Sequence, residues 1–99
     1  MTIPVVAVFV AKPGMEHQLE ELFLGLIDTT LQEDGCISYQ LNRDTQNPRR
    51  FVFTEVWESQ AHLDRHSAAP HLQALAAQLP AYVESADVIV LEKLAGGAA

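Results

Sequence analysis

The chain has 99 residues, a length typical of one domain rather than two. Hydrophobic residues make up 48% of it and charged residues 19%, which excludes disordered, collagenous and coiled-coil proteins. The net charge is -7, so neither nucleic acid nor an anionic membrane surface is an expected partner. We expect a single globular domain over residues 1–99, with a core at 3–94 and a frayed tail at 95–99.

The beginning of the chain and its single cysteine bear on where the protein works. Residues 1–6 contain no Lys or Arg, and the apolar run stops at Lys12, so this segment does not resemble a signal peptide. No apolar stretch approaches the roughly 20 residues that a membrane span requires. Cys36 alone cannot form an internal disulfide, and we interpret it as a small buried hydrophobe. These features predict a soluble, cytoplasmic protein.

The first part of the chain predicts a strand, a helix and a second strand. Residues 3–11 are apolar and mostly β-branched and stop at Lys12-Pro13-Gly14, a pattern typical of a strand that ends in a turn. At 15–34, apolar residues recur at steps of three and four, which predicts one amphipathic helix. We expect Gly35 to close that helix, and the alternation at 37–43 to form a half-buried strand.

The predicted helix has one apolar stripe and one acidic face. The stripe consists of Leu19, Leu22, Phe23, Leu26, Ile27 and Leu31. The acidic face, which contains no basic residue, consists of Glu16, Glu20, Glu21, Asp28, Glu33 and Asp34. We expect the stripe to pack on the sheet and the acidic side chains to be solvated.

The second part of the chain predicts a strand, two helical segments and a last strand. Asn47-Pro48 indicates a hairpin loop before the strand. Ser59 suits the N-cap of the first helix, Pro70 suits the first turn of the second, and Pro80 should end it. The predicted bounds are a loop at 44–50, a strand at 51–57, helices at 59–67 and 70–79, and a strand at 86–94.

The resulting order, βαββαβ, predicts the fold class. It is typical of an α+β, ferredoxin-like antiparallel sheet with helices on one face, in which strands one and three lie in the middle. The face away from the helices is then lined by Val6, Val8, Val10, Val52 and Val56. Since a solvated sheet face normally carries polar residues, we expect these valines to pack against a second copy in a homodimer. The alternative is that loops or the chain end cover them.

Several segments in a fixed order carry a resemblance to a known family. They are Pro13-Gly14, the segments 34–39 and 51–59, His66 and Pro70-His71. Through them, about nine-tenths of the chain resembles the antibiotic biosynthesis monooxygenase (ABM) domain, which includes small quinol monooxygenases. The resemblance implies a dimeric α/β barrel with a ligand cavity between sheet and helices in each subunit. It also implies oxidation of phenolic or quinol substrates by O2 without cofactors, that is, without flavin, haem or metal.

Three positions differ from patterns found in this family. Asp34 stands where the turn into the second strand usually has a proline. Ala7 occupies the place of a strand-one asparagine in haem-degrading relatives, so we do not expect haem degradation. Phe53 occupies a place where polyketide-tailoring relatives can have an asparagine. The resemblance therefore supports the predicted fold more strongly than it supports the predicted reaction.

Cofactor-free oxygenation needs a base that removes a phenolic proton, because the substrate anion itself passes an electron to O2. His66 is our candidate base, since an unperturbed imidazole titrates near pH 6.5 and accepts a proton at neutral pH. It follows Leu63 by one helical turn and so faces the edge of the core. His71 is the alternative base. The plainer interpretation of His66 is a boundary histidine bonded to the backbone.

The third predicted strand supplies further candidates. Trp57 would form a flat wall and direct a ligand oxygen with its indole N–H, unless it is ordinary core. Glu55 shares its strand face with Phe51 and Phe53, which are candidate substrate-binding residues. A buried carboxylate there must find partners. It would orient a histidine or accept a substrate proton, or else pair with Arg43 as plain structure.

The remaining polar residues give weaker signals. Tyr39 is a candidate substrate-binding residue as a donor to an oxyanion, although strand tyrosines often reach solvent. His62 and His66 are four residues apart on a predicted helix, a spacing that permits a metal pair, but no third ligand matches them and we predict no metal site. Arg49 and Arg50 indicate a solvated loop.

The residues and the resemblance lead to one functional prediction with two alternatives. We expect a cytoplasmic homodimer that is a cofactor-independent monooxygenase of a small quinol or phenolic compound, with O2 as co-substrate. The first alternative is an isomerase of a small carbonyl metabolite, of the autoinducer-processing type, in which His66 and Glu55 move a proton without O2. The second is a non-catalytic ligand-binding or stress-response barrel.

Overall fold

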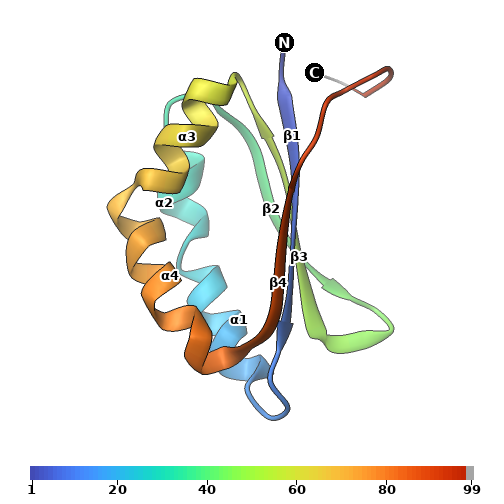
Figure 1. Ribbon diagram of the computed structural model, residues 1–99, viewed down its shortest axis with the longest axis vertical. Helices are drawn as coiled ribbons and strands as arrows, with labels where there is room; N and C mark the ends of the chain where they lie inside the picture. Colours follow the sequence, from blue (N-terminus) through green and yellow to red (C-terminus); the bar gives the residue numbers. More distant parts are fainter. Residues whose placement is uncertain (98–99) are drawn as a thin grey trace.

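A four-stranded antiparallel sheet with helices on one face forms the protein, as the computed structural model shows for residues 1–97 (Figure 1). The strand order β2-β3-β1-β4 places the first and third strands in the middle, as predicted. The predicted ferredoxin-like α+β fold class is confirmed. The bounds are β1 Ile3–Ala11, α1 Glu16–Leu24, α2 Ile27–Leu31, β2 Cys36–Asp44, β3 Asn47–Trp57, α3 Gln60–Ala68, α4 Pro70–Tyr82 and β4 Val83–Val90.

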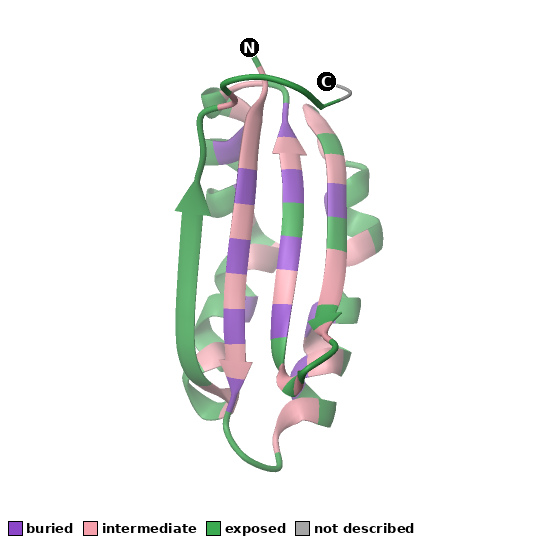
Figure 2. Cartoon of the chain, turned by 90° about the vertical axis from the view of Figure 1, so that its right-hand side faces the viewer, coloured by how far each residue is buried: buried purple, intermediate pink, exposed green. Residues whose placement is uncertain are grey.

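The two central strands alternate between the two faces of the sheet, which Figure 2 shows from the side away from the helices. The buried residues of β1 belong to the core beneath the helices and are Val5, Ala7, Phe9 and Ala11. The opposite face carries the partly exposed valines Val6, Val8, Val10, Val52 and Val56. The central strands are therefore largely apolar on both sides, although Gln40, Asn42 and Asp87 of the edge strands add polar groups beside the valines. This valine face is only partly covered within residues 1–97.

The structure has two helices where the sequence predicted one. Gly25 separates α1 from α2, and the Leu26 N–H donates to the Phe23 carbonyl (3.1 Å), three residues back. This tighter turn changes the phase of the helix. As a result Thr30 is fully buried and Leu31 is 49% exposed, which reverses the predicted end of the apolar stripe.

The β2–β3 hairpin is tighter than predicted, and the loop assigned to 44–50 is wrong. Thr45 and Gln46 alone connect the two strands. Pro48 lies inside β3 because the pairing of β3 with β1 runs only as far as Arg50. The missing N–H of the proline therefore removes no ladder bond to β1.

The last helix and strand also differ from the prediction. α4 does not end at Pro80 but continues to Tyr82, and β4 begins directly after it, earlier than the predicted 86–94. Pro80 lies in the last turn, where its missing N–H removes a single helical bond. Lys12 supports this end, because its N–H donates to the Tyr82 carbonyl (2.9 Å) and its Nζ to the Pro80 carbonyl (2.9 Å).

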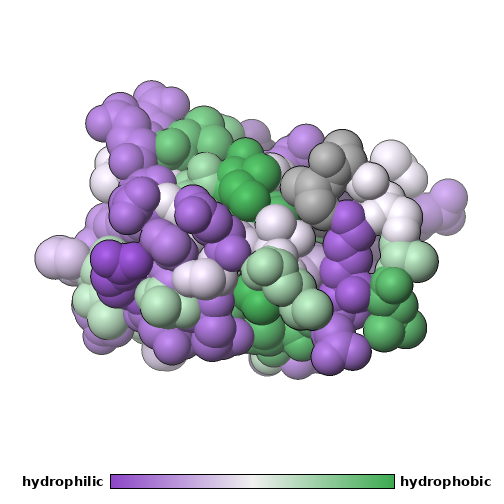
Figure 3. All heavy atoms as spheres, turned by 90° about the horizontal axis from the view of Figure 1, so that it is seen from above, coloured by the Kyte–Doolittle hydropathy of each residue, from purple (hydrophilic) through white to green (hydrophobic). Residues whose placement is uncertain are grey.

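The N-terminus and the last described residues, up to 97, lie at the same end of the sheet (Figure 1). Figure 3 looks onto this end and shows hydrophobic side chains in separate groups among hydrophilic ones. Met1 and Leu94 are 91% and 88% exposed. The tail predicted to fray covers 95–99, and its last two residues lie outside the described range. Within residues 1–97, no helix has the length and apolar character needed to cross a membrane.

Gly35 adopts the left-handed conformation, with φ +82°, in the turn after α2 that leads into β2. An added Cβ would lie 2.2 Å from His62 Cδ2. We expect Gly35→Ala to lower the free energy of unfolding by about 2 to 5 kcal/mol, from about 1–2 for the backbone and about 1–3 for forced repacking. Gly14→Ala is the matched control, because Gly14 has φ +83° and open space around it. Equal losses in urea unfolding would contradict the steric contact.

Candidate active site

A mostly apolar cavity of about 190 Å³ lies between the sheet and helices α3 and α4. All four strands and both helices contribute to its wall. A cavity of about 150 Å³ lined by apolar side chains is known to bind benzene, so this volume suits one aromatic ring with small substituents. The polar side chains on the wall are Tyr39, Glu55, His66, Ser67 and Gln73.

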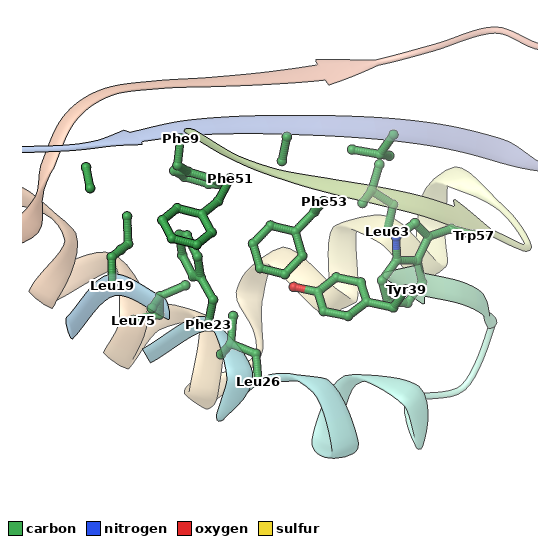
Figure 4. Close-up of a cluster of buried hydrophobic side chains, with 13 residues drawn as sticks. Phe9, Leu19, Phe23, Leu26, Tyr39, Phe51, Phe53, Trp57, Leu63 and Leu75 are labelled. Carbon is green, nitrogen blue, oxygen red and sulfur yellow. The ribbon is translucent and has the colours of Figure 1, made fainter. Parts of the chain in front are cut away.

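Aromatic rings form a row between the sheet and the helices, from Phe9 to Tyr39 and Trp57 (Figure 4). The Tyr39 ring lies 5.1 Å from Phe53 and 6.5 Å from Trp57, measured between ring centroids. Trp57 is fully buried, and its ring lies 4.5 Å from the His66 ring at an interplanar angle of 33°. The imidazole is therefore held between the indole and the cavity, which restricts its orientation.

His66 lies on α3 with its two ring nitrogens in different surroundings. The side chain is 6% exposed and borders the cavity. Its Nδ1 lies 2.8 Å from Glu33 Oε2, in the turn that follows α2. Because a carboxylate only accepts hydrogen bonds, this partner assigns the proton of the neutral ring to Nδ1 and the lone pair to Nε2. In this tautomer His66 accepts a proton at Nε2.

Glu33 also reaches a second histidine. Its Oε1 lies 3.2 Å from His71 Nε2, yet this buried oxygen makes no hydrogen bond within the described part of the chain. The same nitrogen of His71 is 3.2 Å from Thr30 Oγ1. The His66 and His71 ring centroids are 6.1 Å apart. Glu33, His66 and His71 together form what we call the carboxylate–histidine cluster.

Burial sets the protonation states at the cavity. Desolvation lowers the pKa of His66 from its ordinary value of 6.5, although the nearby Glu33 carboxylate acts in the opposite direction. Burial raises the pKa of the Tyr39 hydroxyl and that of the Glu55 carboxyl. At neutral pH His66 is therefore a neutral imidazole, and Tyr39 keeps its proton and can donate a hydrogen bond.

Glu55 bonds to its own strand rather than to a histidine or an arginine. Its Oε1 accepts a hydrogen bond from Trp57 Nε1 (2.9 Å), and the residue is 7% exposed. The indole N–H is thus already engaged and does not face a ligand oxygen. The predicted alternative pair of Glu55 with Arg43 is wrong, because Arg43 pairs with Glu20 of α1.

Replacing Glu55 with glutamine should make stability less dependent on pH. Because the pKa of this carboxyl is raised in the folded protein, its stabilising effect is complete below the unfolded value of about 4.5 and is lost as pH rises through the folded value. Wild type should therefore lose stability above pH 4.5 relative to Glu55→Gln, by about 1.4 kcal/mol for each pH unit that separates the folded pKa from the unfolded one. The amide oxygen can still accept from Trp57. Urea unfolding at several pH values measures the effect, and parallel curves would contradict it.

The structure places the predicted site residues in two groups. The four that border the cavity are Tyr39, Phe53, Glu55 and His66. The three that do not border it are Phe51, Trp57 and His71. Phe51 lies nearer the start of β3, against Phe23, with ring centroids 5.9 Å apart. Tyr39 does not reach solvent, since it is 6% exposed.

Sequence reasoning missed Glu33 and Thr30. The prediction that Glu33 faces solvent is wrong, because its side chain is 18% exposed and contacts both histidines. The break at Gly25 changes the helix phase, so that Thr30 and Glu33, about one turn apart, face inward. A signal existed in their spacing, but it could be interpreted only once the break was known.

His62 does not join His66 in a metal pair. Its Nδ1 lies 2.6 Å from Ser59 Oγ, and its Nε2 lies 3.5 Å from Asp34 Oδ2. Ser59 is the N-cap of α3, as predicted, and its hydroxyl accepts from the His62 N–H (3.3 Å). His62 therefore has a structural role at the N-cap of α3, and this role explains its position without a metal ion.

A sequence model of a known protein family matches most of this chain. The sequence model of the family described as antibiotic biosynthesis monooxygenase matches residues 2–78. The chain belongs to this family. The match runs from the start of β1 into α4 and so includes every polar residue on the cavity wall.

Individual bacterial proteins resemble the chain along most of its length. Probable quinol monooxygenase YgiN of Escherichia coli is 28% identical over 100 residues, covering 91% of this chain and 96% of the relative. Rv0793 of Mycobacterium tuberculosis, named as a monooxygenase, is 35% identical over 81 residues, covering 80% of this chain and 79% of the relative. The solved structure of Rv0793 superposes with a TM-score of 0.93 at 29% identity, covering 99% and 100% of the two chains. PA3566 from Pseudomonas aeruginosa superposes with a TM-score of 0.90 at 26% identity over 95% of each chain.

Proposed function

We propose that the protein is a cofactor-independent monooxygenase that oxidises a small, single-ring quinol or phenol with O2. The observation that carries this proposal is a neutral, buried histidine, His66, on the wall of an apolar cavity with room for one ring. Family membership supports monooxygenase chemistry, and the name of YgiN supports a quinol as the substrate class.

In the proposed reaction His66 removes a hydroxyl proton of the substrate through Nε2, and Glu33 stabilises the imidazolium that forms. The electron-rich anion passes one electron to O2, and the two radicals combine in the shielded cavity. One oxygen atom enters the ring and the other leaves as water. Overall, a quinol and O2 give a hydroxyquinone and water, so the substrate supplies all the electrons.

The other wall residues have supporting roles in this proposal. Tyr39, protonated at neutral pH, donates a hydrogen bond to the developing oxyanion. Phe53 contacts the face of the substrate ring, and Glu55 accepts a hydrogen bond from a second substrate hydroxyl. Trp57 supports the His66 ring from behind rather than touching the substrate.

Oxygen uptake in metal-free, flavin-free buffer tests this function directly. A panel of single-ring hydroquinones should be consumed with equal molar amounts of O2. With isotopically labelled O2, one labelled atom should appear in the hydroxyquinone product. Consumption of quinol without matching O2 uptake, or label found only in water, would contradict the proposal.

Isomerisation of a small carbonyl compound is the second candidate. It is favoured by two groups on one cavity wall whose pKa values are shifted in opposite directions, that of Glu55 upward and that of His66 downward. The two shifts bring the proton affinities of the carboxyl and the imidazole closer together, which suits a pair that passes a proton to and from one substrate. Turnover of a small carbonyl metabolite under strictly anaerobic conditions would favour this function over oxygenation.

We also propose that the valine face closes against a second copy in a homodimer. Val8 lies in the middle of β1, paired with Val52 and Asp87, so Val8→Lys places a charge on this face. In the monomer the Asp87 carboxylate lies beside the new ammonium group. Wild type should sediment at twice the mass of the 10.9 kDa chain, and Val8→Lys at the mass of one chain. Gln78→Lys, on the exposed side of α4, should keep the dimer mass. Identical masses for wild type and Val8→Lys would exclude this interface.

A further inference from the structure

We propose that the carboxylate–histidine cluster binds a divalent transition-metal ion, and that the bound ion switches off His66 as a base. The first part stands on the geometry of Glu33, His66 and His71 alone. The second part rests on the proposed function. Nothing in the cofactor-free reaction requires a metal, so this site would regulate the enzyme rather than take part in its chemistry.

The three side chains are already close to the spacing of a metal site. The ligand atoms offered by Glu33, His66 and His71 all lie within 4.8 Å of one another. His66 Nδ1 is 2.8 Å from Glu33 Oε2, and His71 Nε2 is 3.2 Å from Glu33 Oε1. Ligands on a tetrahedral ion with bonds of about 2.0–2.2 Å are roughly 3.3–3.6 Å apart. Small side-chain movements therefore bring all three atoms onto one ion.

The chemistry of the donors points in the same direction. Two imidazoles and one carboxylate, with positions left for water, are a ligand set that zinc and other divalent transition metals use in proteins. Glu33 Oε1 is buried and makes no hydrogen bond within residues 1–97, which is a costly arrangement for a carboxylate oxygen. A cation bound between Glu33 and His71 would give this oxygen a partner.

A metal ion can reach the cluster without passing through the substrate cavity. A second, open hollow also borders His66, and its other lining residues include Glu33, Asp34, His62 and Arg65. The Asp34 side chain is 83% exposed and adds negative charge at this opening, which Arg65 partly offsets. His66 borders both spaces, so it lies between the proposed metal entrance and the proposed substrate.

The expected switch follows from the tautomers of His66. A neutral imidazole has one proton and one lone pair on its two nitrogens. While Nδ1–H faces Glu33, the lone pair is on Nε2 and can accept a substrate proton. When Nδ1 binds a metal through its lone pair, the proton moves to Nε2. The nitrogen that remains for the substrate is then a donor and no longer a base.

Zinc titration of the whole chain tests the site without any substrate. Calorimetry with Zn²⁺, and visible absorption with Co²⁺, should show one ion per chain. Because loss of an outer-shell partner alone weakens metal binding about 10- to 100-fold, Glu33→Gln and His71→Asn should each weaken it at least tenfold. His17→Gln, an exposed position on α1, is the control and should bind as wild type does. Circular dichroism checks that each variant is folded.

The outcomes separate the two parts of the proposal. Absence of zinc binding, or binding that is unchanged in both Glu33→Gln and His71→Asn, would overturn the metal site. In quinol oxidation, Zn²⁺ should inhibit wild type over the same concentrations at which it binds, and the activity left in His71→Asn should resist it. Undiminished turnover with the site saturated would overturn the switch. If no quinol is oxidised at all, the proposed function fails, whereas the zinc titration still decides the site.

Discussion

His66→Ala should slow quinol oxidation by about 10²- to 10⁴-fold, the range that a positioned general base contributes. Among the described residues, His66 is the one imidazole on the wall of the apolar cavity, and its Nδ1–H is held by Glu33, which leaves the lone pair on Nε2. Without it the substrate must lose its proton to water, so the reactive anion becomes scarce at neutral pH. The measurement is kcat/KM from initial rates of O2 uptake.

His62→Asn provides the matched control for this result. His62 lies on the same helix one turn earlier, but its contacts are with Ser59 and Asp34 rather than with the substrate cavity. Its kcat/KM should stay within about twofold of wild type, since it makes no contact in the transition state. A His66→Ala enzyme that remains folded and keeps wild-type turnover would exclude His66 as the base and leave another group to be found.

Phe23→Ala should lower the free energy of unfolding by about 3 to 5 kcal/mol, the usual cost of removing a buried phenylalanine. Phe23 is fully buried, and its ring centroid lies 5.0 Å from Phe9, 5.9 Å from Phe51 and 4.9 Å from Phe53. It thus joins α1 to both central strands. Because these neighbours belong to the rigid sheet, the cavity left behind cannot easily collapse.

Leu24→Ala is the matched control, because Leu24 is the next residue of α1 and is 50% exposed. Exposed substitutions of this kind usually change stability by less than about 0.5 kcal/mol. Urea unfolding of the three proteins measures both effects. Similar losses for Phe23→Ala and Leu24→Ala would mean that the ring cluster does not carry the contact between helix and sheet that the structure shows.

The sheet could be predicted well because its signal is local. Alternation along β1 and β3 assigns each side chain to a face by a period of two, and the structure has the same faces. Phe53, Glu55 and Trp57 were therefore placed correctly on the buried side. The strand ends were less predictable, since they depend on pairing partners far away in the sequence, such as Ala11 for Val83.

The site was harder to predict because it depends on the phase of one short helix. A glycine within an amphipathic helical pattern does not by itself indicate that the helix is broken, yet Gly25 separates α1 from α2. Only the changed phase turns Glu33 inward, where it meets His66 from α3 and His71 from α4. These three residues come from three different segments, so no local sequence pattern predicts that they lie close together.

The position of Val88 has a consequence for how this architecture diversifies. Val88 pairs with Ala7 across the edge of the sheet, borders the cavity and is 60% exposed, so it stands at the rim. It also lies beyond residue 78, where the match to the shared family pattern stops. Val88, the threshold of the cavity, therefore lies outside the matched stretch of chain, whereas the polar residues of the cavity wall lie inside it. If the proposed function holds, a bulkier or smaller residue at this threshold should change which rings enter the cavity, while His66 and its partners stay the same.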